Sequence, residues 1–264
     1  MTQLRCLDLS LPTPAENLAC DEALLDWCET GHSPTGILRF WEPQQPFVVL
    51  GYANRLETEV DVAAAASAGV PIFRRCSGGG TVLQAPGCLN YSLILRIDGL
   101  LEGITETNCW IMKRNAAALE AQLGSPIGVK GYTDLALGDS KFSGNAQRRK
   151  RHWLLFHGTF LFNADFELMQ RLAGSVPALN PQPSTLNPFE LMQRVLKHPA
   201  KEPPYRAGRS HREFLTAIAL SPDTIRQALR QTWNAAKNLD NPPLEQIRTL
   251  VAQKYSTDAW NLKW

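Results

Sequence analysis

The stretch PIFRRCSGGGTVLQAPGCLNYSLILR, residues 71–96, contains three short apolar segments that are separated by glycine-containing turns. The segments at 71–75, 81–84 and 89–96 have the lengths of strands, and the gaps between them suit hairpins. Parallel strands would instead need crossovers of about a dozen residues or more, usually formed by helices. The stretch therefore predicts an α+β domain with a mostly antiparallel central sheet, and a doubly wound parallel sheet is the weaker alternative.

The centre of this stretch, Arg74-Arg75-Cys76-Ser77-Gly78-Gly79-Gly80-Thr81-Val82, is suited to binding an anion. Three successive glycines let the backbone adopt positive φ and approach a ligand, and successive N–H groups form an anion-binding concavity. The two arginines can add charge-assisted contacts to phosphate or carboxylate. The loop fits neither the Walker pattern nor GxGxxG before a helix, because a strand-like segment follows it. Taken alone, it is also compatible with a simple turn.

Helices and strands are expected on both sides of this stretch, in an irregular order. Thr13-Pro14-Ala15-Glu16 combines a capping box with a proline in the first turn, and predicts a helix that continues to Gly31. Hydrophobic patterns and turn residues predict strands at 4–9, 36–41, 46–50 and within 127–163, and helices at 57–68, 105–123, 188–197, 210–220, after Ser221 and after Asn241. Helices are therefore expected to flank the sheet.

Residues 174–208 differ in composition from the rest of the chain. Seven prolines crowd this stretch around one short helical pattern, which is typical of a surface excursion or lid. The remainder, 209–264, is expected to be a helical C-terminal part. A length of 264 residues leaves room for one large domain or two modest ones.

Composition excludes several classes of protein. The chain has 27 basic and 25 acidic side chains, and a net charge of +2 gives no global reason to expect nucleic acid. No apolar run reaches the roughly 18 to 20 residues of a membrane helix, and the N-terminus lacks a signal-peptide pattern. The six cysteines form no CxxC pair, so we expect them to be buried and reduced. These observations predict a cytoplasmic protein that binds neither membranes nor nucleic acid.

A second chemically suggestive segment, 138–147, places one cation among small residues. Lys141 is a compact point charge between a turn and a strand, suited to a phosphate or a polarised carbonyl, although a solvated hairpin lysine is the alternative. His157 is either a structural residue or a direct participant, and His211 is expected to cap or order its helix. Neither histidine has a spaced His or Cys partner, so we expect no metal role for them. The basic run 148–151 is either a solvated hairpin tip or an electropositive rim for an acidic partner or a phosphate.

Taken together, these segments resemble the lipoate–protein ligase family, within the biotin/lipoate ligase and transferase superfamily. The resemblance is carried, in the family's order, by NLACDEALL at 17–25, VLG at 49–51 with Asn54, RRCSGGGTV at 74–82, LNYS at 89–92, KFSGNAQ at 141–147 and HGT at 157–159. Weaker similarity continues through 205–214 to Lys254-Tyr255. One glycine run would be unspecific, whereas several motifs in one order are quite specific.

The resemblance implies a catalytic domain like those of class II aminoacyl-tRNA synthetases and biotin ligases, extending over residues 1–264 as a single domain. It implies ATP, Mg²⁺ and lipoate as ligands. A lipoate carboxylate attacks the α-phosphate of ATP to give lipoyl-AMP and pyrophosphate. A lysine of a lipoyl carrier domain, such as an H protein or an E2 subunit, then takes the lipoyl group. The basic tip and the proline-rich stretch are expected near the carrier.

The same resemblance assigns roles to individual residues. Lys141 is expected to contact the α-phosphate and the lipoyl carbonyl oxygen, because preorganised donors and cations stabilise the charge that develops there. The nucleotide is expected to contact Arg75, Gly79, Gly80, Thr81, Val82, Leu83, Asp134, Lys141 and His157. The lipoyl group is expected to contact Gly51, Ser77, Asn90, Lys141 and Gly144. Asp134 is the candidate for magnesium, and no residue is a certain metal ligand.

The sequence departs from the family pattern in several places. Gln84 stands where many members carry His, Thr133 where Asn is common, and Phe156 where a second His is frequent. Longer ligases append a small accessory domain, and none is expected after Trp264. The second half-reaction is then expected either to use a separate accessory subunit or to need none.

Three rival functions are weighed. A cysteine-dependent octanoyl or lipoyl transferase would carry its nucleophile a little upstream of Lys141, but 129–134 contains no Cys. Cys76 could replace it only if a neighbouring arginine lowered its pKa. A biotin ligase would carry a basic-glycine loop that is absent here, and a non-catalytic carrier-binding relative would not need Lys141 with the full glycine loop. The sequence leaves the choice between lipoate and octanoate open.

Overall fold

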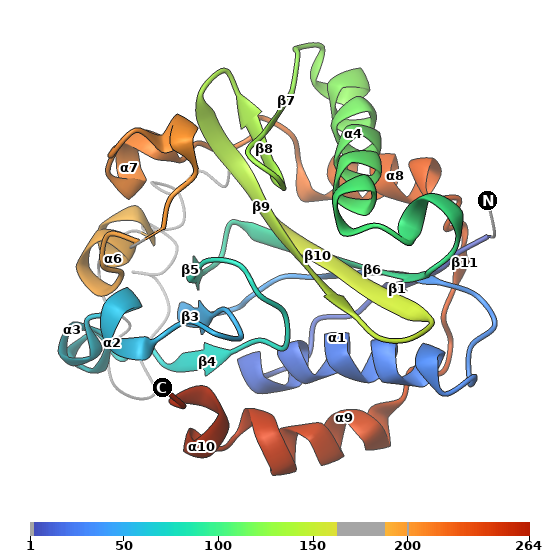
Figure 1. The fold of residues 1–264 in the computed structure, drawn as a ribbon, viewed down its shortest axis with the longest axis horizontal. Coiled ribbons are helices and arrows are strands. Elements are labelled where there is room, and N and C mark those ends of the chain that lie inside the picture. The colour runs from blue at the N-terminus through green and yellow to red at the C-terminus, as the bar shows by residue number, and fades with distance from the viewer. Residues whose placement is uncertain (1–2, 163–187, 200) are drawn as a thin grey trace, which may run out of the picture.

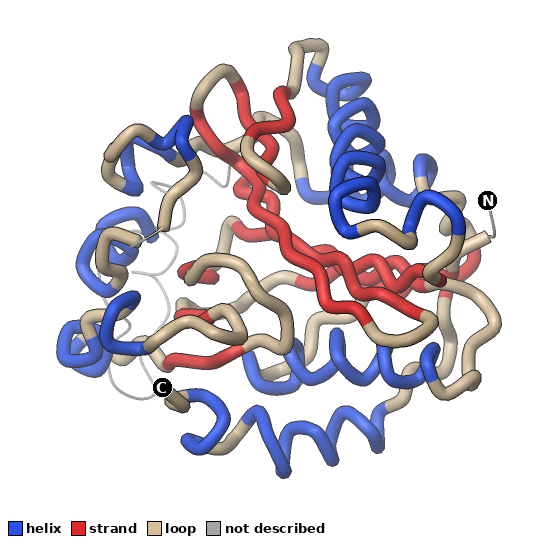
Figure 2. Tube along the Cα trace, in the orientation of Figure 1, coloured by secondary structure: helices blue, strands red, loops and turns tan. Residues whose placement is uncertain are grey.

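The computed structural model describes residues 3–162, 188–199 and 201–264. Much of the proline-rich excursion expected at 174–208 lies outside these residues. Within the described chain, two sheets lie at the centre and helices lie around them, as Figure 2 shows. No described helix is long and apolar enough to cross a membrane.

The larger sheet has eight strands in the order β11-β1-β2-β6-β10-β9-β8-β7. They are β1 (Arg5–Asp8), β2 (Ile37–Trp41), β6 (Cys88–Arg96), β7 (Gly128–Lys130), β8 (Asp134–Leu137), β9 (Ser140–Arg149), β10 (Trp153–Leu161) and β11 (Lys237–Asn238). β1 is parallel to β2 and β11, and the other neighbours in this sheet are antiparallel. The prediction of an α+β fold with a mostly antiparallel central sheet is confirmed.

The smaller sheet has the order β4-β3-β5 and carries the glycine-rich stretch. β3 (Phe47–Leu50) is parallel to β4 (Ile72–Arg74) and antiparallel to β5 (Val82–Gln84). Residues 75–81, which we call the glycine loop, connect β4 to β5. Gly79 has a φ of +90°, and a Cβ on Gly51 would lie only 2.1 Å from the Gly79 carbonyl oxygen. Glycine is therefore needed on both sides of this close approach.

Helices cover both faces of the larger sheet (Figure 1). One face packs against α4 (Ile104–Leu123) and α8 (Pro222–Thr232), and the other against α1 (Pro14–Glu29), with α9 (Leu244–Leu250) beyond it. Side chains alternate between these two cores along a central strand. In β6, Leu93 and Leu95 belong to the first core, and Ile94 belongs to the second. This double burial holds the pocket-lining strands between two layers.

The beginning of α1 agrees with the sequence prediction. The Thr13 side chain accepts a hydrogen bond from the Glu16 backbone N–H, and the Glu16 carboxylate accepts one from Thr13 N–H at 2.9 Å. Pro14 occupies the first turn. The capping box and the proline therefore position α1 as predicted.

A third core lies between the smaller sheet and short helices near the pocket (Figure 1). The remaining helical elements are α2 (Leu56–Glu59), α3 (Val62–Ser67), η1 (Gly99–Leu101), α6 (Pro188–Val195), η2 (Pro204–Arg206), α7 (His211–Phe214), the π-helical turn η3 (Val251–Tyr255) and α10 (Asp258–Asn261). The expected helix at 57–68 is divided into α2 and α3, because Val60 forms a β-bridge with Leu196 and Asp61 caps α3.

The prediction of a helix at 210–220 is wrong beyond the first turn. Only α7 forms, and its cap is Ser210 with Glu213 as the reciprocal partner, so His211 is not the cap. The backbone is extended at Leu215, which bridges Lys141, and Ile218 bridges Phe162. Pairing with the strand ends overrides local helical preference here, and it brings α7 beside the beginning of β9.

Candidate active site

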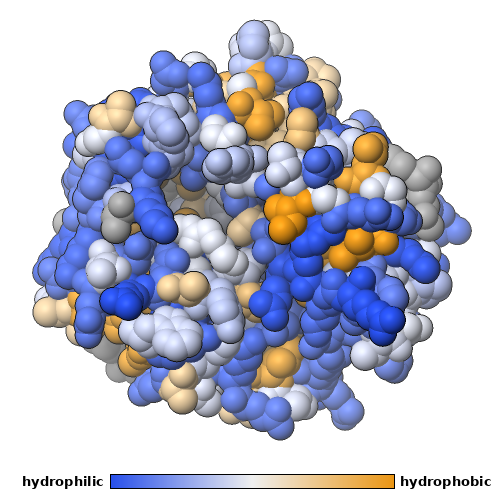
Figure 3. Space-filling view, viewed as in Figure 1, coloured by the Kyte–Doolittle hydropathy of each residue, from blue (hydrophilic) through white to orange (hydrophobic). Residues whose placement is uncertain are grey.

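A cavity of about 510 Å³ opens where the larger sheet meets the glycine loop. β6, β9 and β10 line one part, the glycine loop and β5 another, and α6 with α7 the far side. The corresponding hollow is visible in Figure 3, between the α6–α7 side and β9. The fold therefore places a deep, partly enclosed pocket beside the two segments that the sequence singles out.

Most of the predicted site residues line this cavity. They are Arg75, Gly79, Gly80, Thr81, Val82, Leu83, Asn90, Asp134, Lys141, Gly144 and His157. Gly51 and Ser77 lie behind the lining, where Gly51 packs against Gly79 and Ser77 is 1% exposed. The structure thus brings the predicted residues together, and their individual roles remain predictions.

Lys141 is the cation that β9 presents to the cavity. Its Nζ atom lies 2.8 Å from Asp134 Oδ1, and its side chain is 24% exposed. Tyr205 donates a hydrogen bond to the other carboxylate oxygen of Asp134 at 2.9 Å. A Cβ on Gly144 would lie 2.7 Å from Lys141 Nζ, so the lysine side chain extends across this glycine. Lys141 is therefore held at the pocket wall with its charge accessible.

The pocket does not contain a preformed magnesium site within the described residues. No three His, Cys, Asp or Glu side chains gather there into a metal-binding group. Both carboxylate oxygens of Asp134 already have partners, Lys141 and Tyr205. Because Mg²⁺ needs several oxygen ligands, it would have to bring most of them with it, as a triphosphate complex does.

Arg75 shapes the glycine loop from inside. Its guanidinium donates to the carbonyls of Gly78 at 2.6 Å and Gly80 at 2.8 Å, and to Ser77 Oγ at 3.1 Å. Burial lowers the pKa of Arg75 to about 10. With its donors directed at the loop, Arg75 fixes the backbone whose N–H groups were predicted to bind an anion.

Arg74 does not face the pocket. It is fully buried and donates to the carbonyls of Gly51 at 2.9 Å, Asn54 at 2.7 Å and Lys263 at 2.7 Å. The suggestion that both arginines contact a ligand therefore fails for Arg74. This side chain instead joins the loop after β3 to the C-terminal segment.

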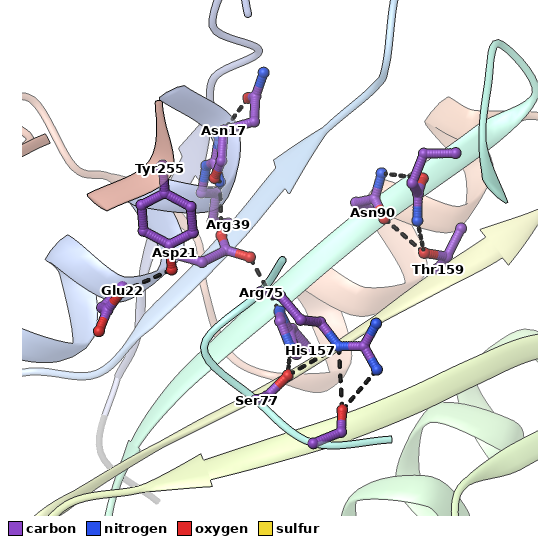
Figure 4. Close-up of polar contacts among 12 residues, drawn as sticks. Asn17, Asp21, Glu22, Arg39, Arg75, Ser77, Asn90, His157, Thr159 and Tyr255 are labelled. Atoms are coloured by element: carbon purple, nitrogen blue, oxygen red, sulfur yellow. Dashed lines mark hydrogen bonds and ion pairs between the residues drawn. The ribbon is translucent and has the colours of Figure 1, made fainter. Parts of the chain in front are cut away.

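A buried polar chain runs from the glycine loop to α1 (Figure 4). Ser77 Oγ lies 2.5 Å from His157 Nε2, and His157 Nδ1 lies 3.1 Å from Asp21 Oδ2. Asp21 Oδ1 accepts a hydrogen bond from Arg39 at 2.6 Å. An ionised carboxylate only accepts, so His157 Nδ1 carries a proton and donates a hydrogen bond to Asp21.

The charge of Asp21 is stabilised within this chain. Burial alone would raise its pKa, but Arg39 and His157 outweigh burial and lower it. Sequence reasoning missed Asp21 and Arg39, although DEALL on α1 was part of the family resemblance. The signal was one acidic residue, Asp21, standing among small and apolar residues in a helix that is buried along most of its length.

A second polar group lies on the pocket wall near β5 (Figure 4). Asn90 donates to Gln84 at 2.9 Å, Gln84 donates to Thr159 at 2.7 Å, and the Thr159 hydroxyl donates to Asn90 at 2.6 Å. Gln84 stands where many relatives were expected to carry His. Its amide closes this three-residue ring, which gives Gln84 a structural role on the pocket wall.

Asn145 supports the floor of the pocket in a way that the sequence did not reveal. Its amide donates to the Thr133 carbonyl at 2.8 Å and accepts from the Tyr91 hydroxyl at 2.7 Å. Asn115 on α4 donates to that hydroxyl at 2.9 Å. A Cβ on Gly158 would lie 1.7 Å from Asn145 Oδ1. The Asn145 side chain therefore occupies the space that a side chain at position 158 would need, so glycine is required there.

Two further titratable groups bear on the chemistry. Cys76 is 3% exposed in a hydrophobic cluster, and burial is the main cause that raises the pKa of its thiol to about 12. His211 lines the cavity, and burial followed by Arg206 lowers its pKa to about 4. Cys76 therefore packs as predicted, and His211 is neutral at ordinary pH. Of the six cysteines only Cys109 is exposed, so the expectation of burial is correct for the other five.

Comparisons with known proteins agree with this arrangement. Residues 13–196 match the family described as Lipoyl protein ligase A/B catalytic domain. Octanoyltransferase LipM of Geobacillus kaustophilus is 26% identical over 290 residues and covers 98% of each chain. Lipoate-protein ligase A subunit 1 of Thermoplasma acidophilum is 26% identical over 275 residues, covering 96% of this chain and 95% of the relative.

Solved structures show the same fold. A structure of the bi-partite lipoate protein ligase and its E2 lipoyl domain from Thermoplasma acidophilum contains a chain with a TM-score of 0.75 at 24% identity, covering 99% of this chain and 97% of that one. A lipoate-protein ligase A bound with ATP gives a TM-score of 0.75 at 23% identity and covers 98% of each chain. These neighbours share the fold of this chain, a mixed α+β arrangement around a mostly antiparallel central sheet.

The chain belongs to the lipoyl protein ligase A/B catalytic domain family. The relatives that it matches are named as lipoate–protein ligases or octanoyltransferases. The family predicted from the sequence motifs is confirmed, and its named members are enzymes of two kinds, ligases and octanoyltransferases.

Proposed function

We propose that this protein is an ATP-dependent lipoate–protein ligase. The proposal is carried by one observation: an accessible lysine, Lys141, faces the glycine loop across a pocket that contains no thiol. All six cysteines lie among the described residues, and none of them lines the cavity. A cysteine-dependent transferase would need a nucleophilic sulfur there, and Cys76 is buried with a raised pKa.

In the first step, a carboxylate oxygen of lipoate attacks the α-phosphorus of ATP. The bond between this phosphorus and the bridging oxygen of pyrophosphate breaks, and lipoyl-AMP and pyrophosphate form. Negative charge on the α-phosphate would be stabilised by the Lys141 ammonium and by backbone N–H groups of the glycine loop, which need no reorganisation. The buried chain Ser77–His157–Asp21 and the side chain of Arg75 would keep the loop in this shape.

In the second step, the uncharged amine of a carrier lysine attacks the lipoyl carbonyl carbon. The carbon–oxygen bond to AMP breaks, an amide forms, and the nitrogen loses one proton. Lys141 would stabilise the carbonyl oxygen as its charge increases. Asp134 and Tyr205 would act on Lys141 by holding its ammonium at the pocket wall.

Relatives support the ligands and partners of this proposal. One neighbouring structure is that of a ligase bound with ATP, and another concerns a bi-partite ligase and its E2 lipoyl domain. We therefore propose ATP and lipoate as substrates, Mg²⁺ as the companion of ATP, and a lipoyl domain as acceptor. One relative is named as a subunit 1, which supports a second polypeptide as a further partner.

The alternative function is octanoyl transfer without ATP. It is favoured by the relative named octanoyltransferase, which matches over nearly the whole of both chains. A named ligase and a named octanoyltransferase are both 26% identical to this chain. The two functions differ in the first step, which consumes ATP in a ligase and not in a transferase.

The deciding experiment is lipoate-dependent exchange of pyrophosphate into ATP, without a carrier. We expect exchange by the wild-type protein and a loss of about a thousandfold in Lys141→Ala, equivalent to about 4 kcal/mol of transition-state stabilisation. The matched control is Lys130→Ala, which removes a lysine whose ion pair with Asp139 lies outside the cavity lining. Wild-type protein that shows no exchange but transfers octanoyl groups from an acyl carrier protein would establish the transferase instead.

A further inference from the structure

Beside the glycine loop, aromatic rings and cations gather from three distant segments of the chain. Tyr52 follows β3, Arg148 lies near the end of β9, and Trp260, Lys263 and Trp264 belong to the C-terminal segment. We call these five residues the rim surface. Tyr52 is 38% exposed and Trp264 is 63% exposed, so two of its rings face solvent to a large extent.

The members of the rim surface stack on one another. Lys263 Nζ lies 3.8 Å from the centre of the Trp260 ring and 4.0 Å from that of Tyr52. The Arg148 guanidinium carbon lies 5.7 Å from the centre of the Tyr52 ring. A cation–π contact holds a charge in place without neutralising it. The rim surface is therefore a preformed arrangement of rings that still carries its charge.

The positive charge of the rim surface has no acidic partner within the described chain. Arg148 and Lys263 form no ion pair there, whereas nearby Lys254 is paired with Glu22 at 2.7 Å. The pKa of Lys263 is lowered by burial and then by three neighbouring cations, which shows how closely like charges gather here. Such a site gains most from an anionic partner.

The rim surface is continuous with the pocket. Gly144 and Ala146 line the cavity from β9, and Arg148 follows them on the same face because side chains alternate along a strand. The Tyr52 N–H donates to the Ser77 carbonyl at 2.8 Å, which fixes Tyr52 against the glycine loop. A macromolecule that inserts a side chain into the pocket on this side would cover the rim surface.

We propose that the rim surface binds an acidic face of the carrier protein while the carrier lysine enters the pocket. This inference rests on the proposed ligase function, in which a protein must present an amine at the pocket. Carboxylates of the carrier supply the counter-charge that Arg148 and Lys263 lack. The exposed rings of Tyr52 and Trp264 exclude water from around these pairs and strengthen them.

The basic tip predicted from the sequence is thereby divided into two parts. Arg149 points away from the rim surface and donates to the carbonyls of Leu101 at 2.5 Å and Glu102 at 3.0 Å. Lys150 is paired with Asp26. Arg151, the fourth residue of the tip, is exposed. Arg148 is the tip residue whose guanidinium lies over the Tyr52 ring, and the C-terminal segment supplies three of the five residues of the rim surface.

The test is charge reversal on the rim surface, in the double variant Arg148→Glu/Lys263→Glu. The control, Lys113→Glu/Lys237→Glu, changes net charge equally at two exposed positions on α4 and β11. Two reactions are measured: lipoate-dependent ATP–pyrophosphate exchange, and lipoylation of an apo E2 lipoyl domain from the same organism. We expect the rim variant to raise the KM for the lipoyl domain about tenfold or more, which corresponds to about 1.4 kcal/mol, and to weaken its dependence on salt.

Exchange is expected to stay within about twofold of wild type in both double variants, because neither rim side chain lines the pocket. Replacing carboxylates of the lipoyl domain by lysine should restore part of the lost affinity of the rim variant. An unchanged KM, or equal loss of exchange and lipoylation, would overturn the docking proposal while the ligase function stands. Absence of exchange in the wild type would refute the ligase function, and the same variants would then be compared in octanoyl transfer to the lipoyl domain.

Discussion

The two sides of the pocket are built in different ways. On the side of the glycine loop, Asp21, Ser77 and Arg75 are each exposed by 9% or less, and each has at least two polar contacts. On the opposite side, Lys141 is 24% exposed and has one ion pair, with Asp134. A buried and saturated network fixes geometry, whereas a partly solvated lysine can exchange its partner for a substrate oxygen. One side supplies shape, and the other supplies charge.

The largest effect is expected from removing the charge at the centre of the buried side. Asp21→Asn leaves the guanidinium of Arg39, which is fully buried, without its ionised partner. Breaking a buried pair in this way costs about 3–5 kcal/mol, so we expect a loss of this size in the free energy of unfolding. The asparagine amide would also face His157 Nδ1 and disturb the hydrogen bond to Ser77. Denaturant unfolding at pH 7 measures the change.

The control for this variant lies on the same helix. Asp26→Asn removes a carboxylate of α1 that is paired with Lys150 and is 22% exposed, and it should cost less than about 1 kcal/mol. The pH dependence gives a second check. Because the folded-state pKa of Asp21 lies below its ordinary value, its contribution is present above about pH 4 and is lost as pH falls through the lowered pKa. Two results would contradict this difference between the two sides of the pocket. One is an equal loss of unfolding free energy in Asp21→Asn and Asp26→Asn, and the other is a difference in stability between wild type and Asp21→Asn that does not shrink in acid.

A smaller effect is expected on the side of the lysine. In Gly144→Ala, the new methyl group would lie 2.7 Å from Lys141 Nζ, so the lysine must move away from Asp134. We expect exchange to fall about 10- to 100-fold, or about 1.4–2.7 kcal/mol, because the cation is displaced from the reacting phosphate. Stability should change by less than about 1 kcal/mol, because a flexible side chain can yield.

Gly128→Ala is the matched control for this substitution. A Cβ at Gly128 meets its nearest atom, Lys130 Cε, at 3.5 Å, which is an ordinary contact. This variant should keep exchange within about twofold of wild type. Full exchange in Gly144→Ala would show that the position of Lys141 does not limit the reaction. A loss of stability in proportion to the loss of activity would show that Lys141 helps to hold the fold, as the buried residues of the other side do.

The same contrast explains what the sequence could predict. Local signals were sufficient for the capping box at Thr13, the three strand segments within 71–96 and the cation at Lys141, because each depends on residues that are close in sequence. The expected hairpins between those segments are wrong: β4 and β5 both pair with β3, and β6 pairs with β2 and β10 in the larger sheet. Asp21 and His157 are 136 positions apart along the chain, and their contact depends on how α1 packs against β10. The expected helix at 210–220 failed for a related reason, since pairing with the strand ends decided its conformation.

Arg74 and Arg75 show most clearly what could not be predicted from the sequence. As neighbours in sequence they were given the same role, but successive side chains point in opposite directions from an extended backbone. Arg75 donates to the glycine loop, and Arg74 donates to carbonyls that include that of Lys263 in the C-terminal segment. Composition and spacing cannot tell which of two adjacent arginines faces a ligand. Tertiary packing decides it.

The smallest effect on activity is expected from Cys76→Ser, next to the buried polar chain. Cys76 packs in the cluster beneath the glycine loop, and burial is the main cause that raises the pKa of its thiol to about 12. The substitution removes a soft apolar atom and adds a buried hydroxyl, so we expect a cost of about 1–2 kcal/mol in stability. Exchange at saturating substrate should remain within about twofold of wild type, because no step uses the thiol.

Cys20→Ser on α1 provides the comparison, because Cys20 is fully buried in the same cluster and lies outside the cavity lining. Similar losses of stability with retained exchange in both variants would show that both thiols only pack in the core. Loss of all acyl transfer in Cys76→Ser alone, with the fold intact by circular dichroism, would instead make Cys76 a nucleophile. The glycine-loop side would then supply chemistry as well as shape, and the division between the two sides of the pocket would fail.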